Sequence, residues 1–242
     1  MNAIEIKGLT KRYGDVVAVD GLSLCIRHGE LFSLLGVNGA GKTTTIKMLS
    51  CLVKPDGGDA TVLGESVIKS PAAVKAVIGV SPQQTAVAAG LSVRENLELM
   101  SGIYGFSAEK TKEKIAALGA MLALEGVMEK RAGKLSGGFA RRLSIAMALV
   151  GEPRVLFLDE PTLGLDVIAR SELWELIRSL KGRVTIILTT HYMEEAEALS
   201  DRIAMMKDGK LLLCDTPDEI KKTTGTGSIE QAFIKVVKGV GK

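Results

Sequence analysis

The sequence predicts an α/β protein whose core is a mainly parallel sheet covered by helices on both faces. Three observations support this class. Beyond about residue 150, continuous apolar runs of strand length alternate with helical patterns. A glycine-rich loop separates an apolar run at 30–35 from a helical stretch at 44–49, and the apolar run at 155–158 ends in two acidic residues. Binding loops of such folds gather at the carboxyl ends of the strands, where both features are expected to lie.

The glycine-rich loop at 36–44 fits the pattern G-x-x-x-x-G-K-[ST]. Backbone N–H groups of such a loop form a nest for an anion, and the following helix turns its positive end toward it. Lys42 is expected to reach the β- and γ-phosphates, and the Thr43 hydroxyl to bind Mg²⁺. The strand before the loop and the helix after it favour a nucleoside triphosphate site over a chance match in a flexible loop. The residues expected to bind the nucleotide here are Gly36, Val37, Asn38, Gly39, Ala40, Gly41, Lys42, Thr43 and Thr44.

Composition and charge narrow the class of protein. The 242 residues are 46% hydrophobic and 24% charged, as expected for one large α/β domain or a core with a subdomain. The net charge of +3 is too small to indicate nucleic-acid binding, and no nucleic-acid partner is expected.

Cysteine spacing indicates a reducing compartment, and the hydropathy pattern indicates neither a signal segment nor a membrane span. Cys25, Cys51 and Cys214 match neither a metal-binding pattern nor a disulfide framework, so free thiols are expected. The N-terminus alternates like a strand instead of carrying an apolar signal segment, and no apolar run approaches the roughly 18 residues of a membrane span. We expect a cytoplasmic chain, so any membrane role must come through a partner.

The first half of the chain contains two patterns of secondary structure. Residues 1–30 alternate between apolar and polar positions and are broken by turn residues, which predicts short antiparallel strands. Residues 54–80 look similar, with a turn cluster at 54–59, a strand after it and a further strand at 76–80. From about 90 to 150 the pattern is helical: Ser92 and Ser107 are expected to cap helices, and 143–150 to form a buried one.

The second half predicts the alternating part of the fold and a separate tail. Strands are expected at 155–158 and 184–188, helices at 169–181 and 194–200, and a hairpin over 203–213. Residues 223–227 resemble a flexible hinge, and the last helix carries an apolar stripe of Ile229, Phe233, Val236 and Val237. That helix is expected to dock either on the body or on a partner.

Asp159 and Glu160 follow the apolar run at 155–158 and form the second chemical motif. An apolar strand that ends in two acids places both carboxylates at the sheet edge beside the nucleotide. Asp159 is expected to hold Mg²⁺ there, directly or through water. Glu160 is expected to orient or deprotonate the attacking water. Two acids can also simply cap the next element. The glycine-rich loop more than a hundred residues upstream favours the catalytic interpretation.

Ser136, Gly137 and Gly138 precede a long helix within Leu-Ser-Gly-Gly and form the third motif. Free N–H donors, a hydroxyl and a positive helix end make a second anion site, although a glycine turn that only caps the helix has the same pattern. One ATP needs only one glycine-rich loop. A second site without a lysine therefore suggests contact with a phosphate bound on another copy of the chain.

These three motifs, in this order and spacing, closely resemble the ATP-binding subunits of ABC transporters from about residue 4 to 213. The resemblance implies a P-loop NTPase (RecA-like) core with an N-terminal antiparallel β subdomain and an inserted helical subdomain at about 84–150. It divides the chain into an ATP-binding domain at 1–215 and a tail at 216–242 with a short amphipathic helix. The implied cofactors are ATP and Mg²⁺.

Four further site residues follow from the resemblance alone. Tyr13 matches the aromatic residue that stacks on adenine, although without the family an interfacial tyrosine is almost as good an interpretation. Gln83 matches a glutamine that touches Mg²⁺ and the attacking water and faces the membrane subunit, with Gln84 left as the alternative. Asp166 matches the loop between two ATP sites, and His191 the histidine at the γ-phosphate. The implied metal ligands are Thr43, Gln83 and Asp159, and the implied catalytic residues are Glu160, His191 and Gln83.

One position departs from the family pattern. Phe139 stands where the motif usually continues with glutamine, which bears on the geometry of the closed site and on its hydrolysis rate. Stretches at 91–97, 141–146 and 191–197 are similar to a narrower branch: bacterial exporters of drugs, antibiotics, polysaccharides or sodium with a separate membrane subunit.

The resemblance implies partners and a location. The partners are a second copy, in a head-to-tail dimer around two ATPs, and a polytopic membrane subunit at the inner face of the cell membrane. The competing class is a soluble ABC-type ATPase that acts on ribosomes or DNA. Such proteins usually carry two such domains, a coiled coil or a zinc insertion, which this sequence lacks. A regulatory module without turnover is disfavoured by Glu160 and His191.

Overall fold

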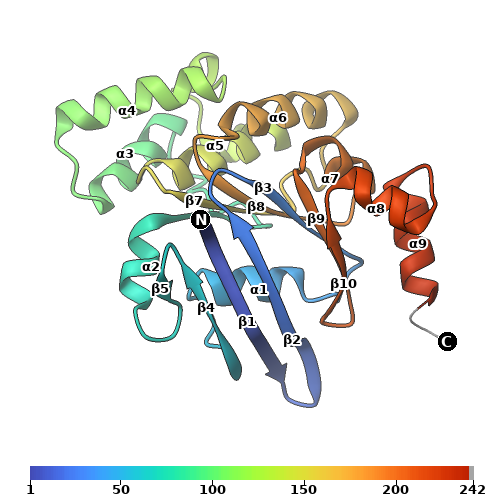
Figure 1. The fold of residues 1–242 in the computed structure, drawn as a ribbon. Helices are drawn as coiled ribbons and strands as arrows, with labels where there is room; N and C mark the ends of the chain where they lie inside the picture. Colours follow the sequence, from blue (N-terminus) through green and yellow to red (C-terminus); the bar gives the residue numbers. More distant parts are fainter. Residues whose placement is uncertain (240–242) are drawn as a thin grey trace.

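The computed structural model describes residues 1–239, which form two sheets with helices packed around them (Figure 1). The first sheet is antiparallel, with strand order β2-β1-β4-β5, and the second has the order β10-β9-β3-β8-β7-β6. The strands are β1 Asn2–Tyr13, β2 Val16–Arg27, β3 Leu31–Leu35, β4 Gly57–Val62, β5 Glu65–Ser66, β6 Ile78–Ser81, β7 Val155–Asp159, β8 Thr185–Thr190, β9 Arg202–Lys207 and β10 Lys210–Asp215. The helices are α1 Lys42–Leu49, α2 Pro71–Val77, α3 Val93–Ile103, α4 Ala108–Met121, α5 Gly137–Leu149, α6 Val167–Leu180, α7 Met193–Leu199, α8 Pro217–Thr224 and α9 Ile229–Gly239, with short 3₁₀ turns at Glu125–Val127 and Ala132–Lys134.

The second sheet is parallel except at one edge, as the apolar runs predict. Strands β6, β7, β8, β3 and β9 run in the same direction, and β10 closes the edge as the antiparallel half of a hairpin. Every residue of β3, β7 and β8 is buried. Continuous apolar strands are required here because both faces of the sheet are covered.

The two faces of the parallel sheet belong to different apolar clusters. Phe32 and Leu34 of β3 pack with the antiparallel sheet and with α1, whereas Leu31 packs with the helices at 93–180. This division follows from the two-residue period of a strand. Figure 1 shows the antiparallel sheet below the parallel sheet and α3, α4 and α6 above it.

Helices α3, α4 and α5 lie between β6 and β7 in the chain, within the expected helical segment. Ser92 and Glu95 form a reciprocal capping box at the start of α3, and the Ser107 side chain accepts a hydrogen bond from Lys110 at the start of α4. Both caps agree with the prediction, since each satisfies N–H groups that have no partner within the helix.

The predicted strand at 76–80 begins two residues too early. The chain forms helix α2 up to Val77, and β6 starts at Ile78. Pro71 at the first turn of α2 fixes φ near its helical value, and its missing N–H costs nothing there. The apolar residues at 76–80 therefore belong to two elements.

The C-terminal segment is more ordered than the predicted hinge at 223–227. Helix α8 includes Thr223 and Thr224, and Gly225 ends it in the left-handed conformation that glycine tolerates. Ile229 and Phe233 of α9 are buried against α7 and β10, with Val236 and Val237 partly buried beside them. The last helix thus docks on the body. Within residues 1–239, no helix combines the length and apolar character needed to cross a bilayer.

Candidate active site

The parallel register brings two of the three predicted motifs, the glycine-rich loop and the acidic pair, to one edge of the sheet. Leu35 pairs with Thr190 and Asp159 with Thr189, so β3, β7 and β8 end side by side. The glycine-rich loop leaves β3 at this edge, and Glu160 and His191 follow the other two strands. Segments more than a hundred residues apart in the chain therefore surround one place.

Glycine is required at two positions of the loop at 36–44. A Cβ atom on Gly36 would lie 2.5 Å from the Met206 carbonyl oxygen, and one on Gly41 would lie 2.4 Å from the Ala18 carbonyl oxygen. Gly41 also has φ of 96°, a value that other residues rarely adopt. Neighbouring backbone leaves no room for side chains at these two positions. Without side chains there, an anion can approach the N–H groups of the loop closely, as an anion nest requires.

The Lys42 side chain lies over its own loop. It is almost fully buried, and its Nζ donates to the carbonyl oxygens of Gly36 at 2.7 Å and Val37 at 3.3 Å. Nζ also lies 3.2 Å from Oε1 of Glu160. Charged phosphate oxygens are stronger acceptors than backbone carbonyls, so this ammonium is placed to exchange its carbonyl partners for a phosphate.

Asp159 and Thr43 form a pair of oxygen ligands at the same edge. The Thr43 hydroxyl donates to Oδ1 of Asp159 at 3.0 Å, and the Thr189 hydroxyl donates to the same oxygen at 2.5 Å. No group of three or more acidic, histidine or cysteine side chains among the described residues could hold a metal by itself. One carboxylate and one hydroxyl nevertheless suit Mg²⁺, which takes its remaining ligands from phosphates and water.

Glu160 lies between Lys42 and His191. Its Oε2 lies 2.7 Å from Nδ1 of His191, and its backbone N–H bonds to the carbonyl and hydroxyl oxygens of Thr189 at 3.1 and 3.0 Å. The backbone of Glu160 has φ of 50°. A non-glycine residue stays in this region only where its surroundings hold it firmly, and such strain is common at active sites. A carboxylate fixed in this way can accept a proton from water.

Two predicted residues are further from this cluster. Tyr13 is 47% exposed at the end of β1, on the hairpin whose second strand β2 contributes the Ala18 carbonyl beside Gly41. Gln83 is exposed on the loop after β6, and its backbone carbonyl accepts a hydrogen bond of 2.7 Å from Arg141. Neither side chain forms a hydrogen bond with Lys42, Asp159 or Glu160.

The Leu-Ser-Gly-Gly motif lies beside the loop of Asp166. Ser136 and Gly137 are exposed at the N-terminus of α5, and the Asp166 side chain caps α6. A Cβ atom on Gly137 would meet Leu165, and one on Gly138 would meet Ala169. These two helix starts therefore share a surface, which also carries the exposed side chains of Val167 and Ile168.

The sequence pattern of the ABC transporter family matches residues 19–163, more than half of the chain. The chain belongs to the ABC transporter family. It is an ATP-binding and ATP-hydrolysing subunit of this family. The loop at 36–44 and the acids at 159 and 160 lie within or at the end of the matched region.

Curated relatives and solved structures agree with this assignment. The daunorubicin resistance ATP-binding protein DrrA2 of Streptomyces coeruleorubidus is 42% identical over 94% of this chain and 71% of its own length. The Nod factor export ATP-binding protein I of Burkholderia orbicola is 45% identical over 88% of this chain and 71% of its own length. The ATP-binding subunit of an ABC transporter superposes with a TM-score of 0.86 at 26% identity, covering 97% of this chain and 99% of the other. The dimeric bacterial ABC transporter cassette MJ0796 has a TM-score of 0.79 at 28% identity, covering 88% and 98%.

Several polar residues around the site of this ABC ATPase subunit were not predicted from the sequence. Arg141 is buried and donates to the carbonyl oxygens of Pro82 and Gln83, both at 2.7 Å. Burial lowers the pKa of its guanidinium, and the carboxyl groups of Asp159 and Glu195 oppose this shift. Thr189 fixes both Asp159 and Glu160. Its sequence signal was a threonine pair ending an apolar strand. Arg141 opens the stretch at 141–146 that resembles the exporter branch, but that resemblance did not assign it these contacts.

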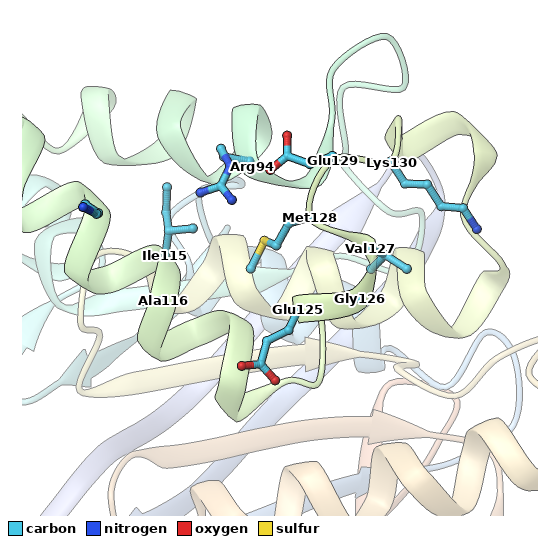
Figure 2. Close-up of a pocket in the computed structure, with 10 residues that line it drawn as sticks. Arg94, Ile115, Ala116, Glu125, Gly126, Val127, Met128, Glu129 and Lys130 are labelled. Carbon is cyan, nitrogen blue, oxygen red and sulfur yellow. Dashed lines mark hydrogen bonds and ion pairs between the residues drawn. The ribbon is translucent and has the colours of Figure 1, made fainter.

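A separate pocket of about 650 Å³ lies in the helical segment of the ABC subunit (Figure 2). Ile115 and Met128 give it apolar surface, and Arg94 forms an ion pair of 2.7 Å with Glu129 beside it. None of the residues predicted to bind ATP lines it, and its charges are mixed. This pocket therefore does not coincide with the predicted nucleotide site.

Proposed function

We propose that the chain powers an exporter by binding and hydrolysing ATP between two copies of itself. The observation that carries the proposal is the separation of two sets of phosphate-binding groups. Lys42, Thr43 and Glu160 gather at the sheet edge. Ser136 and Asp166 lie together at other helix starts and have no recorded bond to that cluster.

Within one chain, the sheet edge supplies the groups for phosphoryl transfer to water. The N–H groups of the loop at 36–44 and the Lys42 ammonium hold the phosphates, and Thr43 and Asp159 hold Mg²⁺ with Gln83. Bound Mg²⁺ neutralises the charge that develops on the phosphate oxygens. Glu160 orients the attacking water and accepts its proton, and His191 contacts the γ-phosphate. Tyr13 stacks on adenine.

The second chain completes each site. Ser136, Gly137 and Gly138 present a hydroxyl and N–H donors at the positive end of α5 to an ATP held by the partner, with Asp166 between the two sites. A two-fold axis makes both contacts equivalent. ATP favours the closed dimer because it touches both chains, and hydrolysis removes the bridging γ-phosphate.

Phe139 gives the first prediction for this clamp. Its ring is partly buried against the helical cluster and lies under the Arg142 guanidinium at 5.3 Å. The Phe139 ring thus contacts groups of its own chain, whereas Ser136 and the glycine N–H groups are the proposed phosphate contacts. The Phe139→Gln variant should therefore keep ATP-dependent dimerisation. Ser136→Ala should weaken it about 10- to 100-fold, since a hydrogen bond to a charged group contributes about 1.5–3 kcal/mol. Sedimentation with ATP measures both variants, and a monomeric Phe139→Gln protein that remains folded would contradict the assignment.

The names of two relatives support the proposal of a membrane partner. DrrA2 is named for daunorubicin resistance and the Nod factor protein for export, and both match most of this chain. We infer a polytopic partner subunit that contacts the Gln83 loop and the helical segment and holds this chain at the inner face of the membrane.

Purification from native membranes tests the partner. Tagged chain, extracted in mild detergent with ATP, should retain a protein with about six apolar spans of roughly 20 residues each. A matched sample from membranes without tagged chain controls for non-specific recovery. Recovery of ribosomes or DNA in place of a polytopic protein would favour the competing soluble class and contradict the exporter.

A further inference from the structure

Glu195 on α7 is a buried acid to which the proposed reaction gives no role. Its side chain has 0% exposure. Its Oε1 accepts hydrogen bonds from the Thr162 hydroxyl at 2.7 Å and from Nε1 of Trp174 at 3.0 Å. Its Oε2 is buried without a hydrogen-bond partner of normal geometry among residues 1–239. A buried polar atom without a partner destabilises a fold, so the position calls for an explanation beyond stability.

Glu195 is connected to the catalytic edge in two ways, through its hydrogen bond with Thr162 and through the chain that follows His191. Thr162 is two residues after Glu160, and Glu195 is four residues after His191. Glu160 and His191 are themselves joined by the contact of 2.7 Å between Oε2 and Nδ1. Covalent and hydrogen bonds thus form a closed ring from Glu160 through Thr162, Glu195 and His191 back to Glu160.

A closed ring fixes the relative positions of its members more firmly than either bond alone. Glu160 needs such support because its backbone is held at φ of 50°, a strained value for a non-glycine residue. Trp174 extends the ring to α6, the helix that Asp166 caps. Displacement of the chain after Glu160 would therefore move both its carboxylate and the start of α6.

The carboxyl group suits this task when it is neutral. Burial raises the pKa of Glu195, the nearby polar side chains of Thr190, Thr162 and Trp174 oppose the rise, and the charge of Glu160 adds to it. The other charged group that acts across this space is Arg141 on α5. The carbonyl oxygen of a neutral carboxyl can accept the hydrogen bonds from both Thr162 and Trp174. The carbonyl oxygen of a glutamine amide can accept the same two bonds.

We propose that Glu195 is a positioning residue for ATP hydrolysis, which holds the segment after Glu160 against the helix that follows His191. It touches neither phosphate nor water and acts through Glu160 and His191. The inference rests on the proposed function of that pair. Its consequence is that turnover depends on Glu195 while ATP affinity does not.

Three variants test this role by separating turnover from binding. Glu195→Leu leaves Thr162 and Trp174 without an acceptor and should lower kcat at least about tenfold, the effect of losing about 1.4 kcal/mol of transition-state stabilisation. Its Kd for a fluorescent ATP analogue should stay within about threefold of the parent value, because the loop at 36–44 is untouched. Glu195→Gln keeps the acceptor and should restore kcat. Thr162→Val should resemble Glu195→Leu.

A matched control and a spectroscopic signal exclude a merely structural effect. Thr224→Val removes another buried hydroxyl, which bonds to the Ile220 carbonyl in α8, and should leave kcat unchanged. Trp174 is the single tryptophan of the chain, so its emission reports directly on the bond to Glu195. The emission should change in Glu195→Leu and stay close to that of the parent in Glu195→Gln.

The outcomes are distinct. Unchanged kcat in a folded Glu195→Leu protein with altered emission would overturn the proposal, and so would equal losses of kcat and ATP affinity, which would indicate general damage. An inactive parent chain would count against the proposed function itself. A parent that turns over ATP, with Glu195→Leu equally active, would count only against Glu195.

The pH dependence of stability provides a second measurement on the same residue. With the pKa raised in the folded chain, the folded state keeps a proton that the unfolded state releases, so the free energy of unfolding falls as pH rises above the ordinary glutamate range. Glu195→Gln cannot titrate and should lose less stability over that range. Denaturant titrations at several pH values compare the two, and parallel curves would show that Glu195 is not held neutral.

Discussion

Glu160→Gln is expected to bind ATP, to hydrolyse it about 10²- to 10⁴-fold more slowly, and to accumulate as an ATP-bound dimer. Loss of a general base has an effect of this size. Glutamine has nearly the same shape, so it can keep the place between Lys42 and His191 and the backbone bonds to Thr189. Binding groups remain in place, and only proton acceptance is lost. The dimer persists because the γ-phosphate that joins the two chains is not removed.

Single-turnover hydrolysis and gel filtration with ATP and Mg²⁺ measure the two effects. Glu194→Gln is the matched control, since it makes the same change at an exposed site on α7. Its hydrolysis rate and elution should equal those of the parent. If Glu160→Gln hydrolyses ATP at the parent rate, Glu160 is not the catalytic carboxylate and the role passes to another group at the sheet edge.

Local signals in the sequence predicted much of the fold. The caps at Ser92 and Ser107 were correct because a capping side chain bonds only to its own helix start. Buried strands were visible as continuous apolar runs. The short helices α2 and α8 were missed because each has only one or two buried positions, too few for a clear period.

The candidate site divides in the same way. The gathering of Lys42, Thr43, Asp159 and Glu160 at one sheet edge could be predicted, because spacing and residue type alone define their motifs. The supporting residues could not, since their contacts join distant segments: Thr189 lies 30 residues from Asp159, and Arg141 lies 58 residues from the Gln83 carbonyl it binds. Every residue has a backbone carbonyl group, so the residue type of the acceptor does not indicate that a side chain such as Arg141 will bond to it. Glu195 lies in the stretch at 191–197 that resembles the exporter branch, but no site role was predicted for it.

Lys42→Ala is expected to lose ATP binding, with an affinity at least about 100-fold below that of the parent. A charged hydrogen bond contributes about 1.5–3 kcal/mol, and attraction between unit charges near a surface adds to it. The change also removes the cation beside the buried Glu160 carboxylate. Breaking one side of a buried ion pair destabilises a protein by about 3–5 kcal/mol, an upper limit here because His191 still contacts Glu160. Lost binding could then reflect lost structure.

The double variant Lys42→Ala/Glu160→Gln separates these two explanations. It removes both charges of the pair, so its free energy of unfolding should return toward the parent value, while ATP affinity should stay as low as in Lys42→Ala. Lys47→Ala, an exposed lysine on the same helix α1, should change neither quantity. Calorimetric titration with ATP and chemical denaturation measure the two quantities independently. Recovery of ATP affinity together with stability would show that Lys42 supports the fold alone, because a residue that binds the phosphate cannot be replaced by a change at Glu160.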